Sequence, residues 1–242
     1  ACACLWRSVF RDSFSGDELA QYASYSTMVV MFVIPGAPLL GGFFQDYFGW
    51  QTTFKFIAAY SIFAIAILVF GMQETSKNHK MLNINIKVIA KNYLILLKSP
   101  IFMGMISSVF LSFGAFFSWF IIGPVLLIDR IGMTPSNFGI VSCICGVIGF
   151  GIGGLTNAKF VKMYGIPNML RFGWALMTLG GVLLFLGHFI FALEFWSIVV
   201  PIAIFFYGSS FIWPNAFVTA FSPFGHMAGY SGALYGTTQI GG

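Results

Sequence analysis

The residues that could carry acid–base, redox or metal chemistry are few and widely separated. The three histidines lie in loops or near the ends of apolar runs, where a lone histidine is usually an interfacial residue: His79, His188 and His226. The four cysteines form two pairs with one residue between partners, a spacing that points helical side chains to opposite faces: Cys2, Cys4, Cys143 and Cys145. Neither pair can chelate a metal or easily close a disulfide. We therefore expect no metal, no cofactor and no enzymatic activity.

Charged groups lie at the edges of apolar runs rather than inside them. Asp46, Lys55, Asp129 and Glu194 each fall at the end of a run, and Arg7 is the one charge that could lie within a membrane. Coupling transport to protons needs an ionisable group inside the membrane, where such groups are costly and usually functional. No glycine-rich phosphate loop precedes Lys-Ser or Lys-Thr, so ATP-driven transport has no support. If the whole protein is a proton-driven transporter, its coupling acid is therefore expected in helices that precede residue 1.

One apolar run, from residue 99 to 128, has a polar and small face. At 100° per residue, Ser108, Ser112, Ala115 and Trp119 fall within about 60° of one another. Four phenylalanines fall on roughly the opposite face: Phe110, Phe113, Phe117 and Phe120. In a membrane the polar, small face tends inward, and a purely apolar face can meet lipid. We predict that Ser112 and Trp119 face a substrate cavity and that Phe113 and Phe117 point outward.

The same reasoning places Asn215 inward, with Phe211 four positions earlier on the same face. An inward tryptophan with hydroxyl and amide neighbours suits flat, amphipathic and often cationic substrates, partly through cation–π attraction. The alternative is that Trp119, which lies near the end of its run, is an interfacial anchor.

Composition decides the class of protein. Apolar residues make up 58% of the chain and charged residues 8%, whereas an ordinary soluble domain carries about 25% charged residues. So little charge cannot cover a water-exposed surface, and the chain is therefore predicted to be an integral membrane protein. The formal charge of +5 does not indicate nucleic-acid binding, because no basic patch is interleaved with polar, base-reading residues.

Charge-free runs place the membrane spans, each of which needs about 20 apolar residues. The runs cover residues 19–45, 56–73, 99–128, 131–158 and 172–193, and a last run from 195 is broken at Ser222–His226. These runs are continuously apolar, unlike the alternating strands of about ten residues in outer-membrane barrels. We predict an all-α polytopic bundle with six full spans and two partial ones.

The only long polar connector covers residues 74–98, where aliphatic residues alternate with lysines. Its second half is predicted to be a basic amphipathic helix on the membrane surface; the alternative is a plain solvated linker. Basic residues are unequally divided between the two sides, with Lys55 and Arg130 on one and ten on the other: Arg7, Arg11, Lys77, Lys80, Lys87, Lys91, Lys98, Lys159, Lys162 and Arg171. This asymmetry predicts a cytoplasmic connector.

Two stretches combine glycine with apolar residues inside predicted spans. Proline removes a backbone donor and kinks a helix, and glycine lets a neighbouring helix approach closely. Residues 34–42 therefore predict a bend held against a partner helix, with generic helix packing as the alternative: Pro35, Gly36, Pro38, Gly41 and Gly42. Residues 149–154, with four glycines, predict close packing between helices.

Residues 34–42 also resemble the antiporter signature on the fifth helix of drug/proton antiporters of the major facilitator superfamily, with Ala37 in place of a glycine before Pro38. Other stretches, in order, resemble the Bcr/CflA drug-resistance branch of that superfamily: Arg11-Asp12, Phe14-Ser15-Gly16, Phe48-Gly49-Trp50, Glu74-Thr75, Ile122-Gly123-Pro124, Pro135-Ser136-Asn137-Phe138-Gly139, Pro214-Asn215-Ala216, Ala228-Gly229 and Ser231-Gly232-Ala233-Leu234. The chain departs from the family in its loop between helices eight and nine, read as Gly154–Lys159, where Asn157 replaces a common Asp and weakens the case for a salt-bridge gate.

The resemblance implies a fragment that runs from late helix four to early helix eleven of a twelve-helix fold. Residues 1–73 would end the N-terminal bundle, 74–98 would be the linker, and 99–242 would belong to the C-terminal bundle. It further implies a monomeric secondary transporter of a bacterial inner membrane that exports drug-like small molecules in exchange for protons by alternating access. The expected partners are the lipid bilayer, a small-molecule substrate and protons. The alternatives are a metabolite transporter on the same fold and a non-transporting membrane scaffold.

Overall fold

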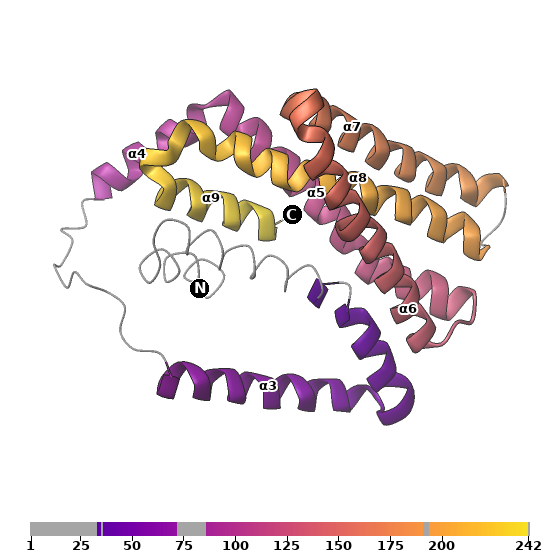
Figure 1. Cartoon of the computed structure of the whole chain (residues 1–242). Helices are drawn as coiled ribbons and strands as arrows, with labels where there is room; N and C mark the ends of the chain where they lie inside the picture. Colours follow the sequence, from indigo (N-terminus) through magenta and orange to yellow (C-terminus); the bar gives the residue numbers. More distant parts are fainter. Residues whose placement is uncertain (1–32, 35, 72–85, 191–193, 242) are drawn as a thin grey trace. The chain divides into compact units, whose positions relative to one another are not determined.

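Helices make up the fold throughout the part of the chain that the computed structural model describes, residues 33–34, 36–71, 86–190 and 194–241 (Figure 1). They are a helix over 36–48, α3 (Trp50–Gly71), α4 (Ile86–Lys98), α5 (Pro100–Pro124), the π-helix η1 (Val125–Arg130), α6 (Pro135–Gly146), the π-helix η2 (Val147–Gly153), α7 (Gly154–Ile190), α8 (Phe195–Phe221), the 3-10 helix η3 (Ser222–Met227) and α9 (Ala228–Gly241). The predicted all-α class is confirmed.

Four described stretches are long and apolar enough to cross a membrane: Trp50–Gly71, Pro100–Arg130, Pro135–Gly187 and Phe195–Phe224. They cover five of the predicted spans, because the third contains two of them. The remaining predicted span, 19–45, lies largely outside the described residues, although its end is helical.

The chain divides into two compact units, each considered separately below. The first comprises Ala1–Met81 and Gly132–Cys143, and the second comprises Leu82–Ile131 and Ile144–Gly242. The first turns of α6 therefore belong to the first unit. The predicted division into 1–73, 74–98 and 99–242 concerns the whole protein and stays a prediction.

Proline and hydroxyl residues fix where the helices begin. Ser99 caps α5 by accepting a hydrogen bond from the Phe102 N–H (3.3 Å), and Pro100 takes the first helical position, where its missing N–H costs nothing. Thr134 does the same for α6, with its Oγ1 accepting from the Asn137 N–H (3.2 Å) ahead of Pro135. Proline and a preceding cap are readable in sequence. The charge-free run that begins at 99 agrees with the start of α5, whereas the run that begins at 131 starts four residues before α6 does.

Glycines with positive φ make three of the turns: Gly49 (78°), Gly132 (81°) and Gly165 (76°). Gly165 lies inside α7 and divides it into two helical limbs, because its φ and ψ are not helical. Pro167 follows shortly after, and the Asn168 side-chain amide donates to the Tyr164 carbonyl (2.9 Å) at the end of the first limb. Such an arrangement closes one helix and begins the next.

The loop predicted over Gly154–Lys159 is wrong. Those residues are helical, and the turn comes later, at Gly165. The polar residues of this segment are accommodated within the helix: Thr156 donates to the Ile152 carbonyl (2.7 Å), and Asn157 is buried. Lys159 ends the charge-free run but not the helix, because a lysine can extend from a helix beyond the apolar layer.

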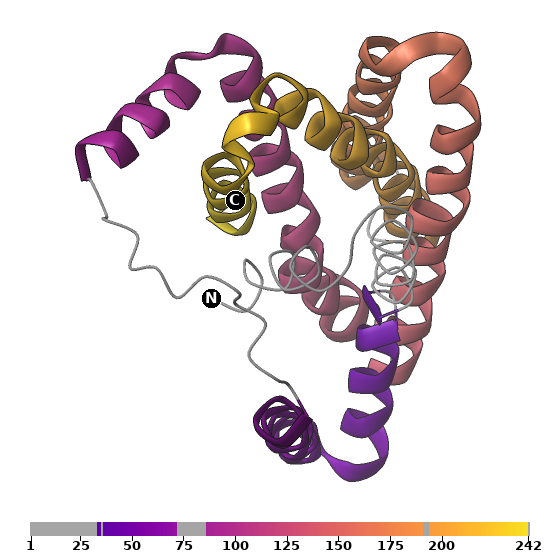
Figure 2. The same ribbon diagram turned by 60° about the vertical axis from the view of Figure 1, so that its left-hand side comes forward.

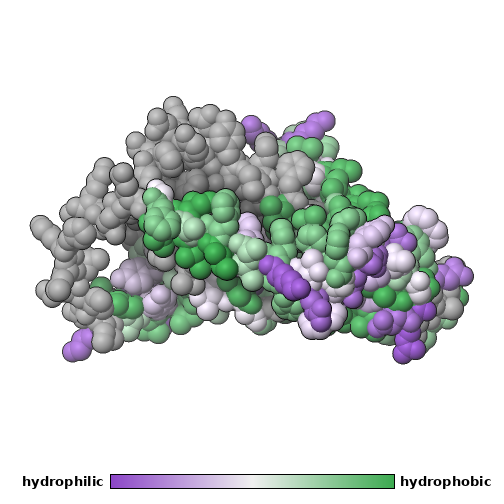
Figure 3. Space-filling view, turned by 90° about the horizontal axis from the view of Figure 1, so that it is seen from below, coloured by the Kyte–Doolittle hydropathy of each residue, from purple (hydrophilic) through white to green (hydrophobic). Residues whose placement is uncertain are grey.

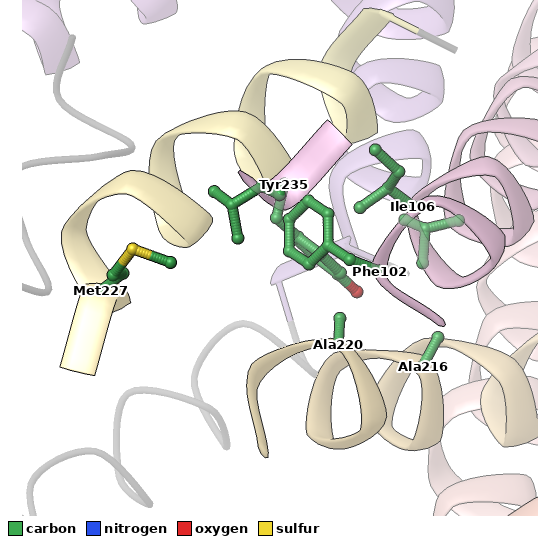
Figure 4. Packing of buried hydrophobic residues seen from close by; sticks show 8 residues of the cluster. Phe102, Ile106, Ala216, Ala220, Met227 and Tyr235 are labelled. Carbon is green, nitrogen blue, oxygen red and sulfur yellow. The ribbon is translucent and has the colours of Figure 1, made fainter. Parts of the chain in front are cut away.

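A buried cluster of the second unit joins four helices and the short η3 segment (Figure 4). Phe102 and Ile106 of α5 pack with Ala216 and Ala220 of α8, and Leu96, Val109, Met227 and Tyr235 complete the cluster. α8 and α9 are joined by η3, where Phe224 departs from helical geometry. The predicted break at Ser222–His226 is therefore confirmed.

Many apolar side chains lie on the surface of the described residues, shown green in Figure 3. α3 is the extreme case, because none of its residues is buried and Phe70 is 88% exposed. An apolar helix of this kind would be unstable in water, but lipid tails solvate it as well as a protein interior does.

We expect Gly165→Ala to destabilise the full-length protein by about 1–3 kcal/mol, because a side chain at this φ and ψ strains the backbone. A Cβ there would meet only Pro167 at 3.8 Å, so the strain is conformational and not steric. Gly104→Ala is the matched control. It lies within α5 with open space around it, and should leave the thermal midpoint in detergent unchanged or raise it. Equal midpoints for both variants would contradict the assigned turn.

Candidate functional site

The polar face of α5 is covered by indole groups from two other helices. Ser112 is fully buried, and its Oγ accepts a hydrogen bond from Trp213 Nε1 of α8 (3.1 Å) while donating to the Val109 carbonyl (3.1 Å). One turn earlier, the Ser108 Oγ accepts from Trp174 Nε1 of α7 (2.8 Å). The face that sequence periodicity marked as inward is therefore directed at α7 and α8.

Trp213 lies at the centre of an aromatic cluster. Its ring centroid is 4.9 Å from that of Phe113 and 5.2 Å from those of both Phe116 and Phe150. The outward placement predicted for Phe113 is therefore wrong, because its position next to the Ser112 face brings it against α8. Phe117 is 48% exposed. Where two neighbouring helices pack on a third, its buried face spans more than 100°. The projection of α5 alone could not show the width of that face.

Trp119 is buried, with 4% of its surface exposed, and lines a pocket of about 150 Å³ between α5, α7 and α8. The rest of the lining is small or aliphatic apart from Ser118 and Phe205: Ala115, Ile122, Leu126, Gly180, Gly181, Leu184 and Ile202. The pocket thus offers almost only apolar contacts. It is large enough for part of a small molecule, such as one ring or a short chain.

Asn215 is tied to two groups in the interior of the second unit. Its Nδ2 donates to Asn157 Oδ1 of α7 (2.7 Å) and to the Phe211 carbonyl on its own helix (2.7 Å). Both asparagines are buried. Phe211 is also buried and packs edge-on against Phe172 and Tyr207.

The four predicted cavity residues are all buried, and Trp119 alone among them lines the pocket. Ser112, Phe211 and Asn215 bind or pack against other side chains. Sequence reasoning missed Trp213, Trp174 and the pair Gly180-Gly181. A usable signal existed for Trp213, which directly precedes Pro214-Asn215: an indole N–H inside a membrane needs an acceptor on a neighbouring helix.

In the first unit, Gly42 makes the helix contact expected of the proline–glycine motif. A Cβ at Gly42 would collide with the backbone of Pro135, and the Ser136 Oγ donates to the Gly42 carbonyl (3.3 Å). The contact is reciprocal, since a Cβ at Gly139 would collide with the backbone of Pro38. Gly36 and Gly41 have open space instead, and Pro35 lies outside the described residues.

Asp46 extends this contact by one turn. Its Oδ2 accepts a hydrogen bond from the Ser136 N–H (2.8 Å), one of the donors at the start of α6 that lack partners within the helix. A carboxylate there also interacts favourably with the helix dipole. The glycine contact and the carboxylate together join helix 36–48 to the first turns of α6.

Comparison with known proteins agrees with this helical architecture. The sequence description of the Major Facilitator Superfamily matches residues 2–242. The chain belongs to the Major Facilitator Superfamily. Members of this superfamily are membrane transporters rather than enzymes, which agrees with the four helical stretches that are long and apolar enough to cross a membrane.

Three similar proteins have names that refer to drug resistance. A bicyclomycin resistance protein homolog from Haemophilus influenzae is 28% identical over 96% of the chain and 58% of the relative. Multidrug resistance protein MdtM from Salmonella typhimurium is 25% identical over 86% of the chain and 50% of the relative. Multidrug resistance protein D from Escherichia coli is 24% identical over 96% and 57%. The chain spans about half the length of these relatives.

We expect Ser112→Ala to destabilise the full-length transporter by about 1 kcal/mol, because the Trp213 indole then loses its acceptor inside the bundle. Ser118→Ala is the matched control on the same helix, since the Ser118 hydroxyl is exposed and donates only to the Gly114 carbonyl (2.9 Å). Thermal unfolding in detergent, followed by tryptophan fluorescence, measures both. The same loss for Ser118→Ala would show that the indole bond contributes nothing.

Proposed function

We propose that the whole transporter exports amphipathic, drug-like small molecules in exchange for protons by alternating access. The named relatives support drug resistance as the biological role. Alternating access moves a substrate past two helical bundles around a site near the middle of the membrane. The second unit supplies helices to one of these bundles in this proposal.

The observation that carries the proposal is an interior rich in aromatic side chains, in which none of the buried residues that the structure describes is ionised. The described parts of α5, α8 and α9 contain no Asp, Glu, Lys or Arg. Their buried contacts are indole–hydroxyl bonds, an asparagine pair and aromatic packing around Trp213. Such surroundings suit lipophilic substrates that carry few hydrogen-bonding groups, and disfavour sugars or anionic metabolites, which need polar or cationic partners.

Proton coupling in this proposal depends on a carboxyl elsewhere in the whole transporter, since those three helices contain none. The ten-to-two division of basic residues favours a cytoplasmic connector 74–98. Bacterial relatives favour a bacterial inner membrane. We further propose that the transporter acts as a monomer.

Efflux from cells tests the proposal directly. The full-length gene is expressed in a bacterial host that lacks its own efflux pumps, and release of a preloaded lipophilic dye is followed with and without a protonophore. Export that depends on the gene and stops with the protonophore is the expected result. Dye release and antibiotic sensitivity that do not change with the gene would overturn the drug-export proposal, and export insensitive to the protonophore would overturn proton coupling.

Trp119→Ala should change the substrate profile of export, because it removes the largest side chain that lines the apolar pocket. We expect a loss of roughly tenfold for aromatic dyes, equivalent to about 1.4 kcal/mol of lost contact, and less for small aliphatic compounds. Trp196→Ala is the control, since Trp196 is 69% exposed at the start of α8. Export of a panel of dyes and antibiotics is measured for both variants. Unchanged export of every compound by Trp119→Ala would show that Trp119 does not contact the substrate.

Gly42→Leu should abolish export, whereas Gly41→Leu should retain most of it. Only Gly42 has a neighbouring backbone where its side chain would lie, and in lipid a lost backbone contact is not replaced by a hydrophobic force. Both proteins add the same side chain to adjacent positions, so membrane insertion is matched. Immunoblots of membranes establish equal abundance before efflux is compared. Equal export activity of the two variants would favour the alternative interpretation, in which the motif serves only generic helix packing.

A further inference from the structure

Helix α4 docks on the second unit through one face. Leu96 is fully buried in the cluster with Phe102 and Tyr235, and the ring of Tyr93 lies edge-on to Tyr230, with centroids 5.6 Å apart. Ile89, one turn before Tyr93, is half-buried on the same side. α4 is therefore attached to α5 and α9 rather than being a free linker.

The opposite face of α4 is a lysine stripe, which comprises Lys87, Lys91 and Lys98. At 100° per residue these three fall within about 40° of one another and about 140–180° from Leu96. All three are exposed. Docking through Leu96 thus fixes the direction in which the lysines point. The sequence of α4 contains no acidic residue.

Exposed aliphatic side chains flank the lysine stripe on both sides. Val88 and Ile95 lie on one flank, at 50% and 42% exposed, and Leu94 and Leu97 lie on the other, at 51% and 48%. Four half-exposed aliphatics on a 13-residue helix are unfavourable in water. They are favourable at the boundary between headgroups and acyl chains, where lysines extend toward phosphates and the aliphatics enter the apolar layer.

The position of α4 in the fold places it at that boundary. Only Ser99 separates it from α5, which is the start of a membrane span, and α4 turns away from the line of α5 (Figure 2). A helix that directly precedes a span and leaves its axis is held near the end of that span. In a membrane protein, the end of a span lies at headgroup depth.

We propose that the lysine stripe of α4, with its aliphatic flanks, binds anionic phospholipid. The chemistry favours a lipid over nucleic acid, because the flanks are aliphatic and carry no groups that read or stack on bases. It favours a lipid over an acidic protein, because the helix is held at a bilayer surface and each basic residue near an anionic leaflet contributes attraction. This inference rests on membership of a membrane-transporter family and is independent of the substrate or coupling ion.

Lipid association can be measured on the full-length transporter without any transport assay. The protein is reconstituted in phosphatidylcholine vesicles that contain a spin-labelled phosphatidylglycerol or a spin-labelled phosphatidylcholine. The ratio of the two association constants comes from the motionally restricted fraction of each label. For a variant with Lys87→Gln, Lys91→Gln and Lys98→Gln, we expect the preference for phosphatidylglycerol to fall at least about fivefold, the effect of one basic residue near an anionic leaflet.

Two matched variants make the result specific. Lys159→Gln, Lys162→Gln and Arg171→Gln together remove the same charge from exposed positions of α7, and we expect this variant to keep most of the preference. Arginine at the three α4 positions should restore it, which also shows that the fold tolerates substitution there. An unchanged preference in the α4 glutamine variant would overturn the proposal, as would an equal loss in the α7 variant. Displacement of the labelled lipid by inorganic phosphate at constant ionic strength would indicate a soluble-anion site instead.

Discussion

Close backbone contact between α8 and its neighbours is the constraint on which the second unit depends. A Cβ at Gly173 would lie 2.9 Å from the Gly208 carbonyl oxygen, and one at Gly208 would lie 2.8 Å from that of Gly173. Gly180 meets the Pro201 backbone, and Gly149 meets Phe206, in the same way. Because lipid tails are as apolar as leucine, helices in a bilayer associate by packing and hydrogen bonding. The approach at these glycines therefore holds α8 where Asn215 reaches Asn157 and Trp213 reaches Ser112.

The sequence predicted the helices well because their ends are set by local chemistry. A cap and a proline begin α5 and α6, and a positive-φ glycine ends a helix at 49, 132 and 165. The loop expected at Gly154–Lys159 came from the family resemblance, whereas the charge-free run 131–158 correctly placed Gly154–Ala158 within a helix. A charge-free run reports the apolar layer, however, and not where the helix ends. α7 continues past Lys159 because its backbone hydrogen bonds are internal and independent of the surrounding solvent.

The candidate site was predictable only as far as one helix could show it. Periodicity correctly placed Ser112 and Trp119 in the interior, because the projection depends on a single axis. It could not show that Ser112 would accept a hydrogen bond from Trp213 or that Trp119 would line a pocket. Both outcomes depend on how α7 and α8 cross α5. The placement of Phe113 failed for the same reason. Contacts between residues about 100 positions apart leave no trace in local spacing.

The polar groups buried in this unit make bonds that are individually weak. Within the described residues, no buried side-chain nitrogen or oxygen lacks a partner. Several bonds, such as Ser209 to the Phe206 carbonyl and Ser210 to the Tyr207 carbonyl, stay within α8. Bonds between helices in a membrane average about 0.6 kcal/mol, so exchanging Asn157–Asn215 or Trp213–Ser112 for other partners costs little. An ion pair in the same place would cost far more to separate. Helices held by glycine contacts and uncharged bonds can therefore shift relative to one another without separating charge.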